Sequence, residues 1–356
     1  MNSSIRDSRS HAVSVRYAVR NRIFVLVAAV LAPTAAAAQT QELPAGSLPE
    51  VNDHLQLNWK DVERNIWNAA KPYLDYPLPE LEQAVPELKG LEPASSQEQL
   101  SSLLERASEK CVDLLRRTPN VISHEEVITE SPHVKPWRQE FEYLLVARRT
   151  QNDVELEEYR TDKHGRPLND QAAEGPHSQG LASMWVHLYP GNRGQSRFRY
   201  LGQQQIDKHK TFVLAFAQIP DLVKHPGQFR FRGTWISLLY QGVAWIDSTD
   251  FRIVHMREDL LAPRPDAYLK KLAASVRFDE VNISKAASSL WLPQEAVVEW
   301  DFNGRIAQER HLYSHYRLYA VKSRILPTHL KIEDTIHPPT DLRSPCLRLC
   351  YNFRHD

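Results

Sequence analysis

The sequence is poor in cysteine, with three in 356 residues. That number is too small for a scaffold held together by disulfides. Cys111 falls on the apolar face of a predicted helix, which favours a buried thiol over a reactive one. Cys346 and Cys350 could pair across one helical turn, but in an extended strand they would lie roughly 13 Å apart, too far for a bridge. Both alternatives, one disulfide or two free thiols, stay open for this pair.

The sequence also lacks an excess of either charge, with 44 Lys and Arg against 44 Asp and Glu. Without residues 1–38, which hold five Arg and one Asp, the balance is 39 basic to 43 acidic residues. A nucleic-acid-binding protein would be expected to show a basic stripe, so this class of function is not expected. Beyond the N-terminus no apolar run is long enough to cross a bilayer, and we expect the exported product to be soluble.

The common catalytic motifs are missing as well. There is no Gly-x-Ser-x-Gly motif, and the glycines of "GNRGQ" (191–195) lack the strand–loop–helix context of a phosphate-binding loop. His124-Glu125-Glu126 lacks the second histidine of a zinc protease motif. His311 and His315 have the spacing of a zinc pair on a helix, but their segment alternates like a strand, which would put the rings about 13 Å apart. We expect no metal and no cofactor.

Acidic pairs are the remaining candidates for catalysis. Glu125-Glu126 and Glu157-Glu158 both lie in predicted strands, so the two members of each pair point to opposite faces. We do not expect them to converge as the two carboxylates of a glycosidase do. The sequence therefore predicts a protein without catalytic residues, and an unrecognised hydrolase is a remote alternative.

What the sequence does contain begins with an export pattern. Arg6, Arg9, Arg16, Arg20 and Arg22 precede an apolar run from Ile23 to Leu31, and Ala36-Ala37-Ala38 precedes Gln39. A basic lead, a short apolar run and small residues before a cleavage point are typical of a secretory signal peptide. A membrane anchor is the alternative, but a spanning helix needs about 20 apolar residues, and this run is shorter and is followed by Pro33. We expect residues 1–38 to be removed on export to the periplasm.

The mature chain divides into three parts. Residues 39–94 are rich in proline and predict an irregular arm with a short helix around Val62 to Ala70. Residues 95–325 form the main domain, and 326–356 are a tail. The domain opens with a helix over 95–118, since Ser95-Ser96-Gln97-Glu98 offers an N-cap and leucines recur at helical spacing.

The rest of the main domain is a series of β-runs. They cover 120–130, 139–150, 153–162, 196–207, 209–219, 227–247, 251–260, 275–283, 290–302, 305–319 and 321–325, and a short helix is possible at 181–189. Asn303-Gly304 is a strong hairpin signal. Several runs are apolar on both faces, which indicates cover on both sides of the sheet. We predict a mainly β (α+β) fold, a curved antiparallel sheet or half-open β-barrel with the N-terminal helix packed on its concave face.

Two stretches of this sequence resemble a known family. "GVAWIDSTDFRIVHMREDL" (242–260) and "SLWLPQEAVVEWDFNGR…RHLYSHYRLY" (289–319) are similar to strand patterns of the LolA/LolB-type lipoprotein-carrier superfamily, which includes MucB/RseB-type regulators. The resemblance covers roughly 95–325. It implies an open half-barrel whose lumen binds an acyl chain or an apolar peptide, and it brings no catalytic residues. The arm, an insertion at 163–180 and the tail depart from simple carriers.

These observations predict a non-catalytic cell-envelope protein that binds or carries a lipid, an acyl chain or a lipoprotein in its half-barrel. The alternative is an envelope protein–protein interaction or sensor module. Apolar pockets are lined by aromatic side chains, although the same side chains also fill cores. In the 242–260 hairpin we expect the charged second strand (Arg252, Arg257, Glu258, Asp259) to run toward solvent. The candidate ligand-lining residues are Phe198, Tyr200, Phe212, Phe216, Trp235, Trp245, Trp291 and Trp300.

Overall fold

The computed structural model describes residues 24–25, 59–149, 154–162, 164–165, 178–231 and 234–319. Apart from Phe24 and Val25, the segment predicted as a signal peptide (1–38) lies outside these residues. The tail (326–356), with Cys346 and Cys350, lies outside them too. The export signal and the state of these two cysteines therefore stay predictions.

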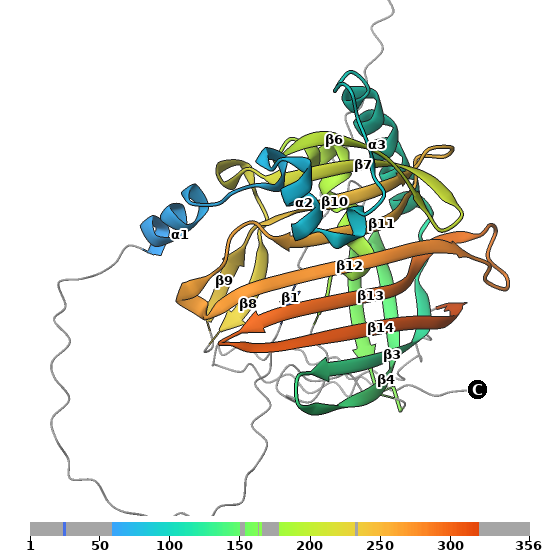
Figure 1. Ribbon diagram of the computed structural model, residues 1–356. Helices are drawn as coiled ribbons and strands as arrows, with labels where there is room; N and C mark the ends of the chain where they lie inside the picture. Colours follow the sequence, from blue (N-terminus) through green and yellow to red (C-terminus); the bar gives the residue numbers. More distant parts are fainter. Residues whose placement is uncertain are drawn as a thin grey trace, which may run out of the picture.

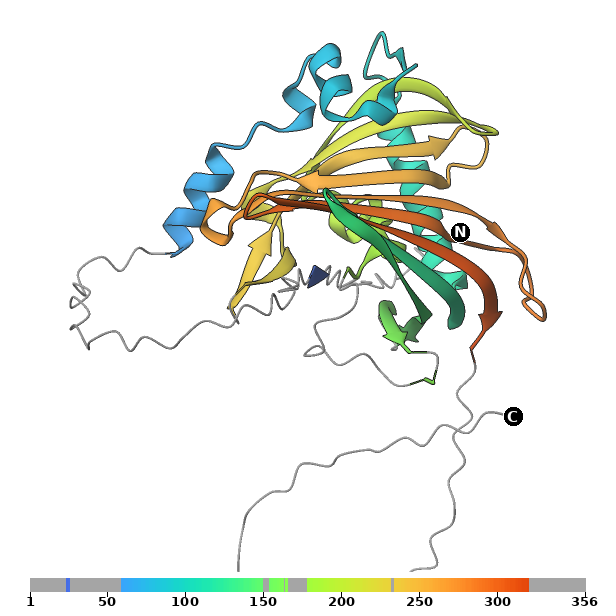
Figure 2. The same ribbon diagram turned by 60° about the horizontal axis from the view of Figure 1, so that its bottom comes forward.

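Most of the described chain forms one antiparallel sheet of eleven strands (Figure 1). The strand order is β2-β6-β7-β10-β11-β12-β13-β14-β3-β4-β5, and within the described residues the edge strands β2 and β5 do not pair with each other. The sheet is therefore curved but open, which confirms the predicted fold class (Figure 2). The strand bounds are β2 Glu92–Pro93, β3 Val121–Ser131, β4 Val134–Arg149, β5 Val154–Thr161, β6 Ser196–Ile206, β7 His209–Gln218, β10 Tyr240–Asp247, β11 Ile253–Leu260, β12 Leu269–Val281, β13 Leu290–Phe302 and β14 Arg305–Leu318.

Three short strands form a second sheet: β1 (Phe24–Val25), β8 (Gly227–Phe231) and β9 (Thr234–Leu238). The sequence pattern predicted one run over 227–247, and this prediction was wrong. The run is divided because β8 pairs antiparallel with β9, whereas β10 pairs with β7 in the large sheet.

The turn between β13 and β14 is the hairpin that Asn303-Gly304 predicted. Phe302 pairs with Arg305 across it, and both turn residues have positive φ, 51° at Asn303 and 73° at Gly304. A two-residue turn with two left-handed residues matches the right-handed twist of the flanking strands. The local sequence therefore sets the register of these two long strands.

The concave side of the sheet holds α3 (Leu100–Arg117) and η3 (Leu181–Leu188), a 3₁₀ helix (Figure 2). The helix predicted over 95–118 is thus confirmed, but it begins later than expected. Gln99 is its N-cap without a side-chain hydrogen bond. Gln97 instead bonds the backbone of Tyr200, accepting from its N–H and donating to its carbonyl oxygen, which keeps the preceding residues out of the helix. Among the described helices, none is long and apolar enough to cross a membrane.

The convex side of the sheet is covered by part of the Pro-rich arm. The arm comprises α1 (Trp59–Asn68), η1 (Tyr73–Asp75), α2 (Leu78–Ala84) and η2 (Pro86–Leu88), and it ends in β2. The backbone N–H of Tyr73 donates to the Gln241 side chain at 2.7 Å, and Gln204 donates to the carbonyl oxygens of Glu87 and Lys89. This cover explains why β7 and β10 are buried on both faces. Three further short helices are α4 (Pro190–Arg193), η4 (Pro220–Leu222) and η5 (Pro265–Ala267).

The charged end of β11 does not face solvent, which corrects the expectation from sequence. Arg257, Glu258 and Asp259 are all buried. Arg257 pairs with Asp259 at 2.8 Å and, on the convex side, with Glu87 of the arm at 2.6 Å. Glu258 points to the concave side. Asp259 and, from the arm, Glu87 are the partners that compensate burial of this arginine, because a buried charge without a partner is strongly unfavourable.

Candidate ligand-binding site

A cavity of about 310 Å³ lies between α3 and the concave face of the sheet. Four parts of the chain form it: α3, the loop from β10 to β11 with the start of β11, the β12–β13 hairpin, and Trp185 of η3. This volume is at the lower end of the range of small-molecule sites. The lining residues are Ala107, Lys110, Cys111, Asp113, Leu114, Arg117, Thr118, Trp185, Asp250, Phe251, Arg252, Ile253, Phe278, Ser289, Leu290 and Trp291.

The floor of the cavity is apolar and fixed in place. Trp291 is buried, and its indole N–H donates to the carbonyl oxygen of Ile253 at 2.7 Å, which holds the ring against β11. Cys111 lies on the buried face of α3, as predicted, and its burial raises the pKa of the thiol. A thiol that stays protonated is a small apolar wall group rather than a nucleophile.

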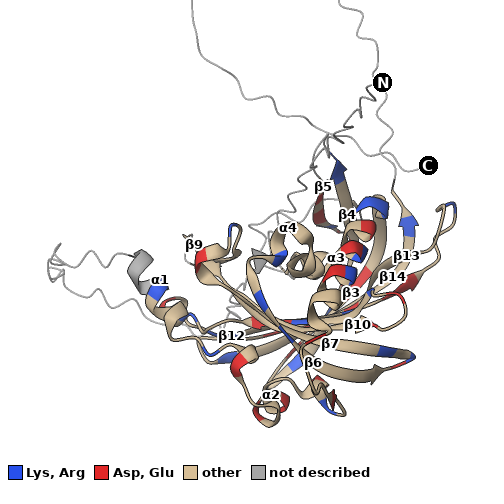
Figure 3. Cartoon of the chain, turned by 90° about the horizontal axis from the view of Figure 1, so that it is seen from above, with Lys and Arg blue, Asp and Glu red and all other residues tan. Residues whose placement is uncertain are grey.

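The rim of the cavity is charged. Arg252 lies over the Trp291 ring, 4.2 Å from its centroid, and forms an ion pair with Asp250. From α3, Lys110, Asp113 and Arg117 complete the rim. Figure 3 shows both signs of charge along α3. An apolar floor under a charged rim suits a ligand with an apolar body and a polar end.

The eight predicted aromatic residues do not form one site. Four of them form two ring pairs on the concave side: Phe198 with Phe216, 6.5 Å between centroids, and Tyr200 with Phe212, 6.2 Å. Of the eight, Trp291 alone lines the 310 Å³ cavity.

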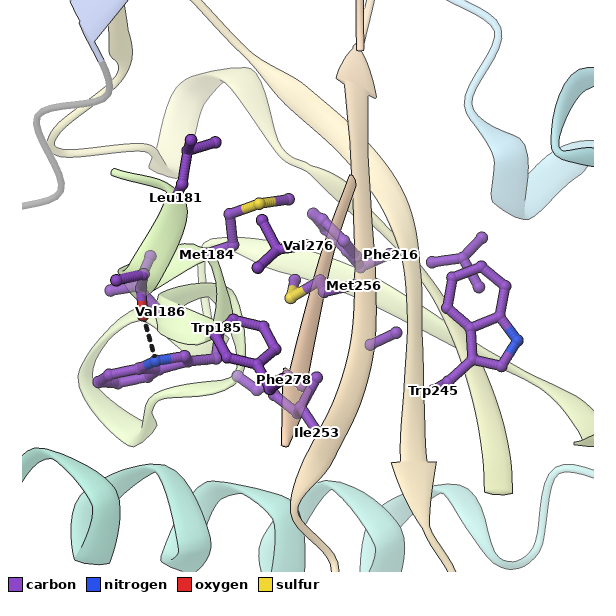
Figure 4. Packing of buried hydrophobic residues seen from close by; sticks show 14 of the residues in the cluster. Leu181, Met184, Trp185, Val186, Phe216, Trp245, Ile253, Met256, Val276 and Phe278 are labelled. Atoms are coloured by element: carbon purple, nitrogen blue, oxygen red, sulfur yellow. Dashed lines mark hydrogen bonds between the residues drawn. The ribbon is translucent and has the colours of Figure 1, made fainter. Parts of the chain in front are cut away.

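The other three aromatic residues lie elsewhere. Trp300 borders a separate hollow of about 420 Å³ beside Pro132 and Ile306. Trp235 is 47% exposed on the small sheet. Trp245 is on the convex side, stacked on His255 and donating to Gln204, which the sequence could not reveal because both faces of β10 are apolar (Figure 4).

A buried polar cluster was also missed. Arg160 holds Glu125 through two hydrogen bonds of 2.6 and 2.8 Å, and His311 bonds the same carboxylate at 2.9 Å. Glu158 is buried nearby and interacts with the charges of both Arg160 and Glu125. Within each acidic pair the two members point to opposite faces, as expected, with Glu125 and Glu158 buried and Glu126 and Glu157 paired with exposed arginines. The approach of Glu125 to Glu158 was not foreseen, and it arises because β3 and β5 both pair with β4. Arg160 balances the charge of Glu125, to which it is bonded, and neither glutamate lines the 310 Å³ cavity.

Among the described residues no three His, Cys, Asp or Glu side chains cluster as metal ligands. His311 and His315 are separated by a bulge in β14, where His315 has a φ of 54°. His311 is fully buried in the cluster above, whereas the imidazole of His315 lies near that of His124, 6.3 Å between centroids.

The fold and cavity define a class: an open, curved sheet with an apolar pocket beneath a helix. No protein-family model matches the chain, and no curated protein matches it. Among solved structures it is similar to a LolA superfamily protein from Nitrosomonas europaea, with 13% identity and a TM-score of 0.33 over 62% of this chain and 94% of that one.

Two further solved structures are similar to the chain. One is an outer membrane lipoprotein-sorting protein domain from Vibrio parahaemolyticus (12% identity, TM-score 0.35, 62% and 95% coverage). The other is a DUF1329 family protein from Desulfovibrio piger (12% identity, TM-score 0.33, 63% and 94% coverage). At these identities and TM-scores the likeness carries no conclusion about function, which is inferred below from the residues of this chain.

Proposed function

We propose that the protein is a non-catalytic cell-envelope protein that binds an apolar ligand, a lipid or an acyl chain, in the cavity between α3 and the sheet. The observation that carries the proposal is the apolar floor of Cys111, Ile253 and Trp291 beneath a charged rim. The envelope location rests on the export pattern of residues 1–38 and is tested by N-terminal sequencing, which should find Gln39 first.

The groups around the cavity favour binding over catalysis. Its buried ionisable group, Cys111, stays protonated, and the charged side chains that border it lie at the rim, where they meet solvent. Arg252 is already engaged by Asp250 and by the face of Trp291. A lipid tail needs only an apolar wall for binding, because removing its surface from water supplies the driving force.

Filling the cavity tests the proposal. Leu114 is half-buried on α3 and lines the cavity, so Leu114→Trp places an indole in the ligand space. We expect this variant to bind the fluorescent fatty acid cis-parinarate about tenfold or more weakly, because the tail would have to displace the ring. The measurement is a fluorescence titration, with circular dichroism melting to check the fold.

Ser102→Trp is the matched control, since Ser102 is exposed on the same helix and does not line the cavity. It should bind the probe as the unsubstituted protein does. Equal affinities of the two tryptophan variants would place the ligand elsewhere. If the unsubstituted protein does not bind the probe at all, the proposed ligand-binding function is contradicted. The alternative hypothesis, a protein–protein interaction module of the cell envelope, would then be favoured.

A further inference from the structure

The 3₁₀ helix η3 is unusual for an interior element. All eight of its residues, Leu181 to Leu188, are buried. 3₁₀ helices longer than three or four residues are uncommon, because their hydrogen-bond geometry is poorer than that of an α-helix. This long segment nevertheless occupies the middle of the concave face, in contact with β11, β12, β13 and α3.

The packing around η3 is incomplete on several sides. Trp185 borders the 310 Å³ cavity, Leu181 and Met184 border a second cavity of about 20 Å³, and Val186 and His187 border a third of about 20 Å³. Protein interiors normally leave few voids larger than a water molecule. The two small voids are each about the size of one water molecule, so the free space beside η3 is mainly that of the 310 Å³ cavity at Trp185.

Polar groups next to η3 are also imperfectly satisfied. The Nε2 atom of His187 lies 3.0 Å from Oε1 of Glu258, but neither atom makes a hydrogen bond of acceptable geometry within the described structure. The buried hydroxyl of Tyr240, which borders both small cavities, has no hydrogen-bond partner among the described residues. All three groups border the small cavities, so within the described residues no direct hydrogen bond from these atoms holds η3 in place.

Direct hydrogen bonds hold η3 near its ends. Glu158 accepts from the backbone N–H of Ala182 at 2.9 Å, and the Ser108 hydroxyl donates to the carbonyl oxygen of Leu188 at 2.6 Å. Gly180, immediately before η3, has a φ of 85°, a conformation that glycine adopts without strain. The segment therefore has a glycine pivot at one end and two side-chain contacts with α3: the Ser108 bond to Leu188, and the Cys111 thiol, which donates to the carbonyl oxygen of Trp185 at 3.8 Å.

The surface beneath η3 is apolar and continues the floor of the cavity. Figure 4 shows Met184 and Trp185 against Met256, Val276 and Phe278. Phe278 already lines the cavity, and Val276 is two residues further along the same strand, on the same face. If η3 withdrew, this apolar surface would join the cavity.

We propose that η3 is a displaceable plug in the deep part of the ligand site, and that the ligand is a long-chain amphiphile whose tail takes the place of η3. The proposal rests on the function proposed above. A short chain fits the existing cavity with η3 in place, whereas a long chain requires η3 to leave.

Hydrogen exchange with two probes tests the displacement directly. Octanoate and hexadecanoate differ only in chain length, and exchange is followed by mass spectrometry of peptides covering 181–188. We expect hexadecanoate to speed exchange of these amides at least about fivefold, because displacement exposes them, and octanoate to leave it unchanged. Hexadecanoate binding with unchanged or slower exchange at 181–188 would overturn the plug while leaving the carrier function intact. Failure of both acids to bind would contradict the carrier function and the plug together.

Removing the Ser108 bond to η3 gives a second test. The affinity for hexadecanoate should rise if η3 must leave, whereas it should stay equal or fall if the bond has only a structural role. Ser108→Ala removes the hydrogen bond to Leu188 and does not change a residue that lines the 310 Å³ cavity. If η3 must leave, this variant should bind hexadecanoate about three- to tenfold more tightly and octanoate equally well, because the inserted state is weakened. Ser102→Ala, on the exposed face of α3, should bind both acids as the unsubstituted protein does. Equal or weaker hexadecanoate binding by Ser108→Ala would contradict the plug.

Discussion

At the scale of single residues, the most constrained group is Glu125. It is completely buried and bonded to Arg160 and His311. Burial alone would raise the pKa of Glu125, but the charge of Arg160 and the hydrogen bonds outweigh it and lower the pKa to about 2. Burial likewise favours the neutral ring of His311, yet its hydrogen bonds with Glu125 and Glu309 raise the pKa of His311.

Neutralising Glu125 should therefore be costly. We expect Glu125→Gln to lower the free energy of unfolding by about 3 kcal/mol or more, because Arg160 would be left as a buried charge without its main partner. Glu126→Gln is the control: Glu126 is on the opposite face of β3 and pairs with an exposed arginine, Arg138, so its loss should cost under about 1 kcal/mol. Urea unfolding of both variants measures the difference, and equal costs would contradict a structural role for the cluster.

The same cluster gives stability a defined dependence on pH. Since the pKa of Glu125 is lowered, its contribution is complete above the ordinary value of 4.5 and is lost as pH falls toward 2. Since the pKa of His311 is raised, its contribution is complete below 6.5 and is lost as pH rises through the raised value. The stability gap between the unsubstituted protein and Glu125→Gln should therefore be largest between these two limits. A gap that does not change from pH 3 to pH 9 would contradict this assignment.

At the scale of elements, strand β10 depends on a glycine. A Cβ at Gly242 would lie 1.9 Å from the carbonyl oxygen of Arg257 on β11 and 2.9 Å from the Phe216 ring. Glycine inside a strand often marks a place where another backbone approaches closely. Here the approaching backbone is that of Arg257 on β11, in the curved part of the sheet next to α3 and η3. Gly242 is also the first residue of the 242–260 stretch that predicted the β10–β11 hairpin in the sequence. The close approach of β10 and β11 therefore depends on glycine at this position.

Gly242→Ala should lower the free energy of unfolding by about 2 to 3 kcal/mol, because the clash is with backbone that cannot move alone. Gly194→Ala serves as the comparison, since Gly194 is in a right-handed conformation (φ −68°) with open space around it. That substitution should leave stability unchanged or raise it by up to about 1 kcal/mol. Denaturant unfolding compares the two, and a tolerated alanine at 242 would show that the close approach is not required.

The elements show which structural features the sequence could predict. Hydrophobic periodicity predicted α3 and most strands, and Asn303-Gly304 predicted one turn, because these signals act over a few residues. The partners of Arg257 and Glu125 could not be predicted, since Glu87 and Arg160 lie 170 and 35 residues away in the chain. The aromatic pattern suggested a lined pocket, but Trp245 lies on the convex face, and the burial of that face depends on the arm, which is distant in the sequence.

At the scale of the whole molecule, the two sides of the large sheet are packed differently. The convex side is closed by the arm through specific bonds, as at Tyr73 and Gln241. The concave side is filled by α3 and η3, and all three of the cavities that border η3 lie there. This asymmetry is the reason we propose ligand binding on the concave side and a structural role for the arm.

The central claim is that an acyl chain binds between α3 and the sheet. Photo-crosslinking with a fatty acid that carries a diazirine on its tail tests this claim most directly, with the attached peptides identified by mass spectrometry. We predict attachment to α3 around 107–118, to 250–253 and to 289–291, the segments that line the cavity. Attachment confined to the arm or to the convex strands, or attachment no greater than to an unrelated protein, would contradict it.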